Sequence, residues 1–323
     1  MRYLAVAAML LLLSSSIARA CEPPSFAARP APPKKIASKT DYWALPDRWD
    51  ASTFDNDGTM WFWYDRTVWH VSSRRVLARF QVSLSSACGS YVSADHAGGV
   101  WLAVGDPIEH VDALGKLTTY RIPGTIRSLS NAGETLFVSD SQFHRIVELD
   151  PNGSMLWRDL QNGAVASNIA IDSQGTVYYS DAGNGFIGAL TSDGRSFEVR
   201  QGARERPAHF TVSQDGINAW FVQDQSWSNG PRIADLGWAR FGAVRMAFPI
   251  FPAQETISIA VSGSGKVYVL ERDGIVGIFD PRSSRFEEYT IVPRLNATSL
   301  KTSSRGDVYA IGYGENPVAK ISP

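Results

Sequence analysis

The amino-acid sequence predicts an all-β fold: a seven-bladed β-propeller closed by an N-terminal strand in the last blade. Three observations predict it. One segment reads as a complete four-stranded meander, its glycine and aromatic positions occur seven times along the chain, and the last unit is one strand short. Because a propeller blade is a four-stranded antiparallel sheet of about 40 residues, we expect residues 40–323 to form one propeller domain.

The clearest unit is the fourth. Thr176–Ser180, Phe186–Leu190 and Arg195–Val199 are short runs rich in apolar, β-branched or aromatic residues, separated by glycine-containing turns. Asn168–Asp172 supplies a strand before them. Short strands bounded by such turns are typical of an antiparallel meander, so this segment predicts one blade.

Two positions of this unit recur along the chain. A glycine opens the second strand of each unit, and an aromatic residue follows it within four positions. The glycines are Gly58, Gly99, Gly133, Gly175, Gly216, Gly265 and Gly306. The aromatic anchors are Trp61, Trp101, Phe137, Tyr178, Trp220, Tyr268 and Tyr309. Large flat side chains at one repeated position favour packing between neighbouring blades, so we expect the anchors to be core.

The two ends of the propeller complement each other. Outer strands read like Leu117–Pro123 or Phe286–Pro293, and Thr40–Pro46 has the same pattern although it precedes the first unit. The last unit ends with residues 318–323, one strand short. We expect Thr40–Pro46 to complete the last blade, which would close the ring and remove its open edges.

The first 20 residues have the pattern of a signal peptide. Arg2 supplies a positive charge, Leu4–Leu13 an apolar core and Ala18–Ala20 a small-x-small cleavage pattern. The apolar core is too short to span a bilayer, so we expect no transmembrane segment and a periplasmic or secreted protein. Cys21 follows the predicted cleavage point, which also fits a lipid anchor. Because Arg19 is a poor residue before a lipidated cysteine, we favour the soluble form.

Residues 21–39 are rich in proline and alanine, which predicts an extended linker. The formal net charge of the chain is only −1, so no nucleic-acid surface is expected. The expected partner is a small molecule, a glycan or a protein of the cell envelope, bound by a monomer. Cys21 and Cys88, the two cysteines, could form a disulfide in an oxidising compartment. Alternatively, Cys88 is a small buried residue.

The fifth unit is the longest, with its extra residues in the stretch 223–244. We expect a projecting loop there that carries Trp227 and Trp238. Loops on a rigid scaffold often carry binding sites, so the two tryptophans could form a platform for a sugar or peptide. The alternative is that they cover the side of the blade.

The ends of the second strands should line one mouth of the central channel. They are Tyr64, Val104, Asp140, Asp181, Gln223, Glu271 and Gly312. Three of them, Asp140, Asp181 and Glu271, are called the rim carboxylates below. Carboxylates that meet at one mouth could hold Mg²⁺ or Ca²⁺, or they could be solvated rim residues.

The fourth unit resembles the repeat of the streptogramin B lyase (virginiamycin B lyase) family, and more distantly other exported propellers of the NHL type. Asp172–Asp181, Gly185–Gly188 and Thr191–Gly194 carry the resemblance. Other units echo it at Ser139–Asp140, His144–Ile146, Asp150–Gly153, Gly265–Glu271 and Gly274–Gly277. The resemblance covers the whole propeller and implies seven blades.

The resemblance also implies a site. In these lyases a histidine of a P-H-x-I segment acts as base, and glutamates that close the second strands, with a second histidine, hold Mg²⁺ during an elimination that opens a lactone ring. Here the matching segment is Arg206–Phe210, where His209 lies one residue beyond the family position. A one-residue shift within a regular strand turns a side chain to the other face. The first glutamate position is Gln223, and the next is Glu271.

Two functions follow from these patterns. The favoured one is a non-catalytic exported propeller that binds a ligand or partner through Tyr64, Asp140, Asp181, Gln223, Trp227 and Trp238. The other is a divergent metal-assisted lyase or hydrolase that uses His209, Glu271, Asp140 and Asp181. A lactonase propeller, whose metal site also uses acidic residues of inner strands, is a weaker third alternative.

Overall fold

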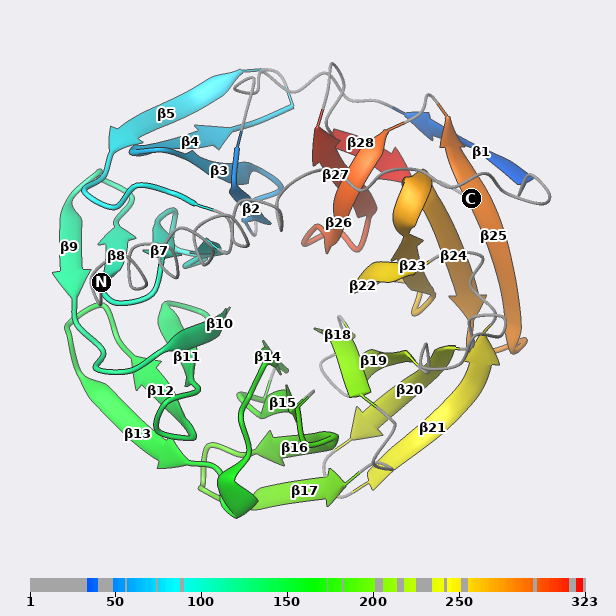
Figure 1. Cartoon of the computed structure of the whole chain (residues 1–323). Coiled ribbons are helices and arrows are strands. Elements are labelled where there is room, and N and C mark those ends of the chain that lie inside the picture. The colour runs from blue at the N-terminus through cyan, green and yellow to red at the C-terminus, as the bar shows by residue number, and fades with distance from the viewer. Residues whose placement is uncertain are drawn as a thin grey trace, which may run out of the picture.

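The computed structural model describes residues 34–39, 49–55, 57–73, 75–87, 90–172, 174–181, 183–200, 206–213, 218–224, 234–240, 243–250, 255–292, 295–313 and 318–321. Its strands form seven blades around a central axis (Figure 1), which confirms the predicted all-β propeller. Among the described residues, no helix is both long enough and apolar enough to cross a bilayer.

The strands follow each other from the axis outward in every blade. Blade one contains β2 (Ala51–Phe54), β3 (Met60–Tyr64), β4 (Thr67–Val71) and β5 (Val76–Gln81). Blade two contains β6 (Tyr91–Ala94), β7 (Val100–Ala103), β8 (Ile108–Val111) and β9 (Leu117–Tyr120). Blade three contains β10 (Ile126–Ala132), β11 (Thr135–Asp140), β12 (Arg145–Leu149) and β13 (Met155–Asp159). Blade four contains β14 (Asn168–Ile171), β15 (Val177–Asp181), β16 (Phe186–Leu190) and β17 (Ser196–Arg200).

The remaining blades follow the same order. Blade five contains β18 (Arg206–Val212), β19 (Ala219–Asp224), β20 (Ala234–Arg240) and β21 (Ala243–Ile250). Blade six contains β22 (Thr256–Val261), β23 (Val267–Glu271), β24 (Ile275–Asp280) and β25 (Arg285–Val292). Blade seven contains β26 (Asn296–Thr302), β27 (Val308–Tyr313) and β28 (Val318–Ile321), to which β1 (Lys34–Lys39) is added. Two short 3₁₀ turns, Gln161–Gly163 and Arg272–Gly274, complete the described elements.

An N-terminal strand completes blade seven, as predicted, and the described part of it, β1, precedes the predicted segment. Strand β1 pairs antiparallel with β28, where Ser38 lies opposite Ile321. It also pairs in parallel with β25 of blade six (Figure 1). The expected strand Thr40–Pro46 lies outside the described residues, and β1 falls within the stretch expected to be linker. Strand β1 is held by backbone pairing, and each of its residues, Lys34–Lys39, carries the amide that such pairing needs.

The aromatic anchors are core, as predicted. Six of them are buried, and Tyr309 is half-buried. They pack between blades: Trp101 of blade two, for example, lies in one hydrophobic cluster with Leu136 and Val138 of blade three. The blades are therefore joined into a ring by large apolar side chains near its inner half, and this fixes where the inner strands lie.

The turn between the first and second strands explains the recurring glycine. In blade four the Asp172 Oδ1 accepts hydrogen bonds from the backbone amides of Gln174 and Thr176, each at 2.8 Å. Gly175 closes this turn with a φ of 76°, a left-handed conformation that favours glycine. In blade two Gly98, with a φ of 93°, takes this conformation next to the predicted Gly99.

Candidate functional site

The inner strands of four blades are irregular near their first residues. The pairing register shifts in β10 between Ile126 and Ser128, and in β18 between Pro207 and Phe210. Strands β22 and β26 carry the same irregularity at the corresponding place. A β-bulge bends a strand and redirects a side chain. The simple alternation of faces therefore does not apply to residue 209.

His209 lies in the wall of the central channel. It is half-buried, and its Nε2 lies 3.0 Å from the backbone oxygen of Thr256 in blade six. Because a carbonyl oxygen can only accept, Nε2 donates this hydrogen bond. The one-residue shift therefore does not turn His209 away from the channel.

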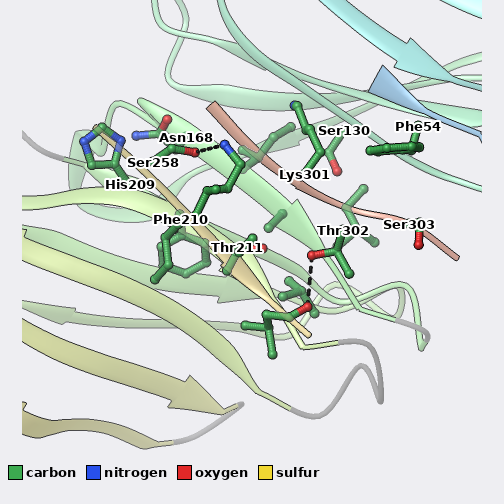
Figure 2. A pocket seen from close by; sticks show the side chains of 18 of the residues that line it. Phe54, Ser130, Asn168, His209, Phe210, Thr211, Ser258, Lys301, Thr302 and Ser303 are labelled. Carbon is green, nitrogen blue, oxygen red and sulfur yellow. Dashed lines mark hydrogen bonds between the residues drawn. The ribbon is translucent and has the colours of Figure 1, made fainter. Parts of the chain in front are cut away.

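Neighbouring inner strands are linked at this level by polar side chains. The Ser128 hydroxyl accepts a hydrogen bond from the Ile169 amide at 3.2 Å, which links blades three and four. The Ser258 hydroxyl accepts one from the Leu300 amide at 2.9 Å, which links blades six and seven (Figure 2). His209 makes the equivalent link between blades five and six. Part of its role is therefore structural.

The inner strands enclose a cavity of about 630 Å³, which we call the central cavity. Strands β14, β18, β22 and β26 supply most of its lining, and Phe54, Asp55, His96, Ser130, Ser303 and Ser304 complete it. Its polar side chains include Ser130, Asn168, His209, Thr211, Ser258 and Lys301 (Figure 2). The volume is in the range of small-molecule sites. Sequence reasoning missed Lys301, which is half-buried, and burial lowers the pKa of its amine.

Asp140 is engaged by its own blade. Its side chain is buried; Oδ1 accepts hydrogen bonds from the Thr125 amide at 3.1 Å and the Gln142 amide at 3.0 Å. Its Oδ2 pairs with the Arg145 Nε at 2.9 Å. A Cβ on Gly124 would lie 2.2 Å from Oδ1, so only glycine lets the incoming loop pass over this carboxylate.

Asp181 is engaged in the same way in blade four. Its Oδ2 accepts from the Val165 amide at 2.7 Å and the Asn184 Nδ2 at 2.8 Å. Its Oδ1 accepts from the amides of Gly183 at 2.9 Å and Asn184 at 3.0 Å. Both carboxylates thus attach the connection from the preceding blade to their own blade.

Blade two does this with a residue that sequence reasoning missed. Glu109 on β8 is buried, and its Oε2 accepts hydrogen bonds from the amides of Ser83 at 3.1 Å and Leu84 at 3.2 Å. Its position in the short strand Ile108–Val111, which has no regular polar pattern, gave no signal for this role.

The rim carboxylates do not converge on one point. Within the described residues, one group of three acidic or histidine side chains has its ligand atoms within 4.8 Å of one another, namely Asp55, Asp57 and His70. Asp140, Asp181 and Glu271 form no such group. Glu271 is buried at the end of β23, where its backbone pairs with Thr256 and Ile275.

The Asp55, Asp57 and His70 group lies at the opposite end of the second strand and is explained by packing. The His70 ring stacks on Trp61 at 4.1 Å, its Nε2 lies 2.5 Å from the Thr59 hydroxyl, and the Trp61 Nε1 donates to Asp55 at 3.1 Å. Burial lowers the pKa of His70 against the opposing effect of Asp57 and Asp55.

Blade two repeats this arrangement. Its His110 stacks on Trp101 at 4.1 Å and bonds Asp95 at 2.8 Å. Burial would raise the pKa of Asp95, but the hydrogen bonds from His110 and the amides of Gly99 and Ala97 lower it. A pairing present in two blades indicates a feature of the fold.

Comparison with known proteins was informative at the level of structure alone. No family model matches the sequence, and no curated protein matches it. A streptogramin B lyase structure is 19% identical and covers 86% of this chain and 95% of its own, with a TM-score of 0.67. Virginiamycin B lyase from Staphylococcus aureus is 15% identical and covers 87% and 96%, with a TM-score of 0.67. The chain has the fold of a streptogramin B lyase.

This likeness does not extend to activity. The β-propeller domain of Cps50 (Swd1) from Myceliophteria thermophila is 10% identical, covers 88% of this chain and 98% of its own, and has a TM-score of 0.68. A propeller with a different name thus matches the chain as well as the streptogramin B lyases do. Identities this low establish a shared fold alone.

The other predicted site residues lie apart from the central cavity. Tyr64 is half-buried and packs against the Trp49 cluster of blade one. Trp238 lies on β20, within the stretch expected to be a loop; it is half-buried and packs against the cluster that contains Trp220. It therefore covers the side of the blade.

Three predicted residues cannot be placed. Trp227, Cys21 and Cys88 lie outside the described residues, as does the side chain of Gln223, although its backbone pairs with Pro207 and Asp235. The metal site, the disulfide and a binding role for Trp227 remain predictions.

Proposed function

We propose that this protein is an exported propeller that binds a small molecule of the cell envelope in its central cavity. The observation that carries the proposal is a polar cavity of about 630 Å³ enclosed by the inner strands. Export is inferred from the pattern of the first 20 residues. The site differs from the rim site predicted from the sequence, because it uses the inner strands in place of the strand ends.

The engagement of the rim carboxylates supports binding over metal-assisted catalysis. In both Asp140 and Asp181, the two carboxylate oxygens are already bonded to backbone amides or neighbouring side chains. A carboxylate in that state would have to give up hydrogen bonds in order to bind Mg²⁺ or Ca²⁺. The inner-strand hydroxyl, amide and imidazole groups are, by contrast, suited to fixing the orientation of a ligand.

The proposal is tested by thermal-shift screening of the purified protein against envelope glycan fragments, organic acids and amino acids. Ser130→Tyr, which fills the cavity from blade three, should abolish the shift that a ligand gives with the wild type. Ser192→Tyr, at an exposed turn, is the matched control and should keep it. Retention of binding by Ser130→Tyr, or no binding by the wild type, would refute the proposal.

A divergent lyase is the second candidate, because His209 lines the central cavity. One comparison structure is a catalytically inactive virginiamycin B lyase with quinupristin, so quinupristin with added Mg²⁺ is the probe. Mass spectrometry should detect a product that disappears in His209→Ala if the lyase hypothesis is correct. Unchanged quinupristin after prolonged incubation argues for the binding function.

A further inference from the structure

One position of each inner strand can be compared across all seven blades. It is the residue paired directly opposite the aromatic anchor of the second strand. Six blades carry a small side chain there: Thr53, Ser93, Ser130, Ala170, Thr211 and Ala260. In blade seven the residue opposite Tyr309 is Lys301.

Small side chains at this position have a physical reason. The inner strands lie nearest the axis, where neighbouring blades approach each other most closely (Figure 1). Lys301 instead carries four methylene groups and a cation, and it lines the central cavity with the hydroxyl-bearing Ser130 and Thr211 (Figure 2). Blade seven thus departs from the repeat at one residue, and that residue faces the cavity.

The charge of Lys301 is not balanced by a protein carboxylate. Within the residues that the structure describes, no ion pair joins its amine to an acidic group. Asp55, the one acidic residue of the cavity lining, accepts a hydrogen bond from Trp61 and lies 3.6 Å from His96. Burial lowers the pKa of Lys301, and no neighbouring charge opposes this shift. An ammonium in such a place costs free energy until an anion joins it.

We propose that the central cavity binds a ligand through its oxyanion group, a carboxylate or a phosphate, and that Lys301 is the cation that pairs with it. The inference rests on the proposed binding function and names the chemical class of the ligand. Ser130 and Thr211 supply hydroxyl donors that can hold further oxygens of the same group. The pairing would be a charge-assisted hydrogen bond, which is stronger than a bond between neutral groups.

Calorimetric titration with inorganic phosphate, malonate and malonamide tests the inference. The phosphate and malonate arms distinguish the two oxyanions, and malonamide is the neutral match of malonate. At pH 8.5 the wild type should bind one of the anions and not malonamide.

Three variants test whether anion binding depends on the charge of Lys301. Lys301→Met should lower the affinity at least tenfold, whereas Lys301→Arg should stay within a few-fold of the wild type. Lys116→Met, which removes an exposed lysine of blade two, should bind as the wild type does. Equal binding by Lys301→Met, or no anion binding by the wild type, overturns the inference. The proposed function still stands in that case if a ligand found by screening binds to the wild type and fails to bind to Ser130→Tyr.

Discussion

The charged groups at the rim of the channel and the charged group on its wall are in opposite situations. At the rim, Asp140 and Asp181 are buried, but their carboxylate oxygens accept hydrogen bonds from backbone amides and from the side chains of Arg145 and Asn184. On the wall, Lys301 has no acidic partner among the described residues and faces a cavity. The comparison teaches that a carboxylate at a channel mouth can serve to stabilise its own blade. The unpaired charge that interrupts the repeat is, by contrast, the feature from which we infer a ligand.

The largest expected effect comes from breaking the rim. Asp181→Ala leaves the amides of Val165, Gly183 and Asn184 without their acceptor, so the free energy of unfolding should fall by about 3 kcal/mol. Urea unfolding measures it. Asp193→Ala, at an exposed turn of the same blade, should change stability little. An unchanged stability of Asp181→Ala without any metal would show that Asp181 is not structural.

On the channel wall, removing the charge of Lys301 should raise the free energy of unfolding instead of lowering it. Lys301→Met replaces an unpaired cation by an apolar side chain of similar length, so we expect stability at pH 7 to rise by about 1 kcal/mol. Because burial lowers the pKa of Lys301 in the folded state, the unfolded chain holds the extra proton, and wild-type stability rises as the pH rises toward the unfolded value.

The gain from Lys301→Met should therefore shrink as the pH rises from the folded pKa of Lys301 toward the unfolded value of about 10.4. Urea unfolding at several pH values follows it, with Lys116→Met as the control whose stability should track the wild type. A loss of stability in Lys301→Met at pH 7 would mean that the amine has a partner in the folded protein.

The sequence predicted the scaffold well and the site poorly, for separate physical reasons. Glycine and aromatic positions are imposed locally by turns and by packing between blades, so Gly175 and Trp101 could be read directly. The role of Asp181 could not, because its donors include Val165, which comes from the connection after the preceding blade. The bulge near His209 and the closing strand Lys34–Lys39 depend on backbone pairing, which leaves little trace in side-chain patterns.

Lys301 did leave a trace in the sequence, since it can be found by aligning the residues opposite the seven anchors. That alignment requires the register between first and second strands, which the structure supplies. Before the register is known, Lys301 is one lysine in a strand of mixed character. The seven-fold repeat therefore becomes useful for function only after the pairing is fixed.

The polar links of the wall should contribute less than the rim. Ser258→Ala removes the acceptor of the Leu300 amide between blades six and seven, and we expect a loss of about 1 kcal/mol in urea unfolding. Ser192→Ala, which is exposed, is the matched control. If Ser258→Ala lowered the free energy of unfolding as much as Asp181→Ala, the polar links of the wall would stabilise the fold as strongly as the rim carboxylates, and the contrast between the two regions would be lost.

The smallest effect should come from His70, which lies outside both regions. Burial lowers the pKa of this ring, so the unfolded chain takes up a proton first as the pH falls below about 6.5. Wild-type stability should therefore decline as the pH falls from about 6.5 to the folded value and level off below it. His70→Gln should remove this part of the pH dependence in thermal unfolding, whereas Asp181→Ala should keep it. If His70 held a metal with Asp55 and Asp57, a chelator would shift the wild-type transition at neutral pH; because the ring is already placed by Trp61 and Thr59, we expect no shift.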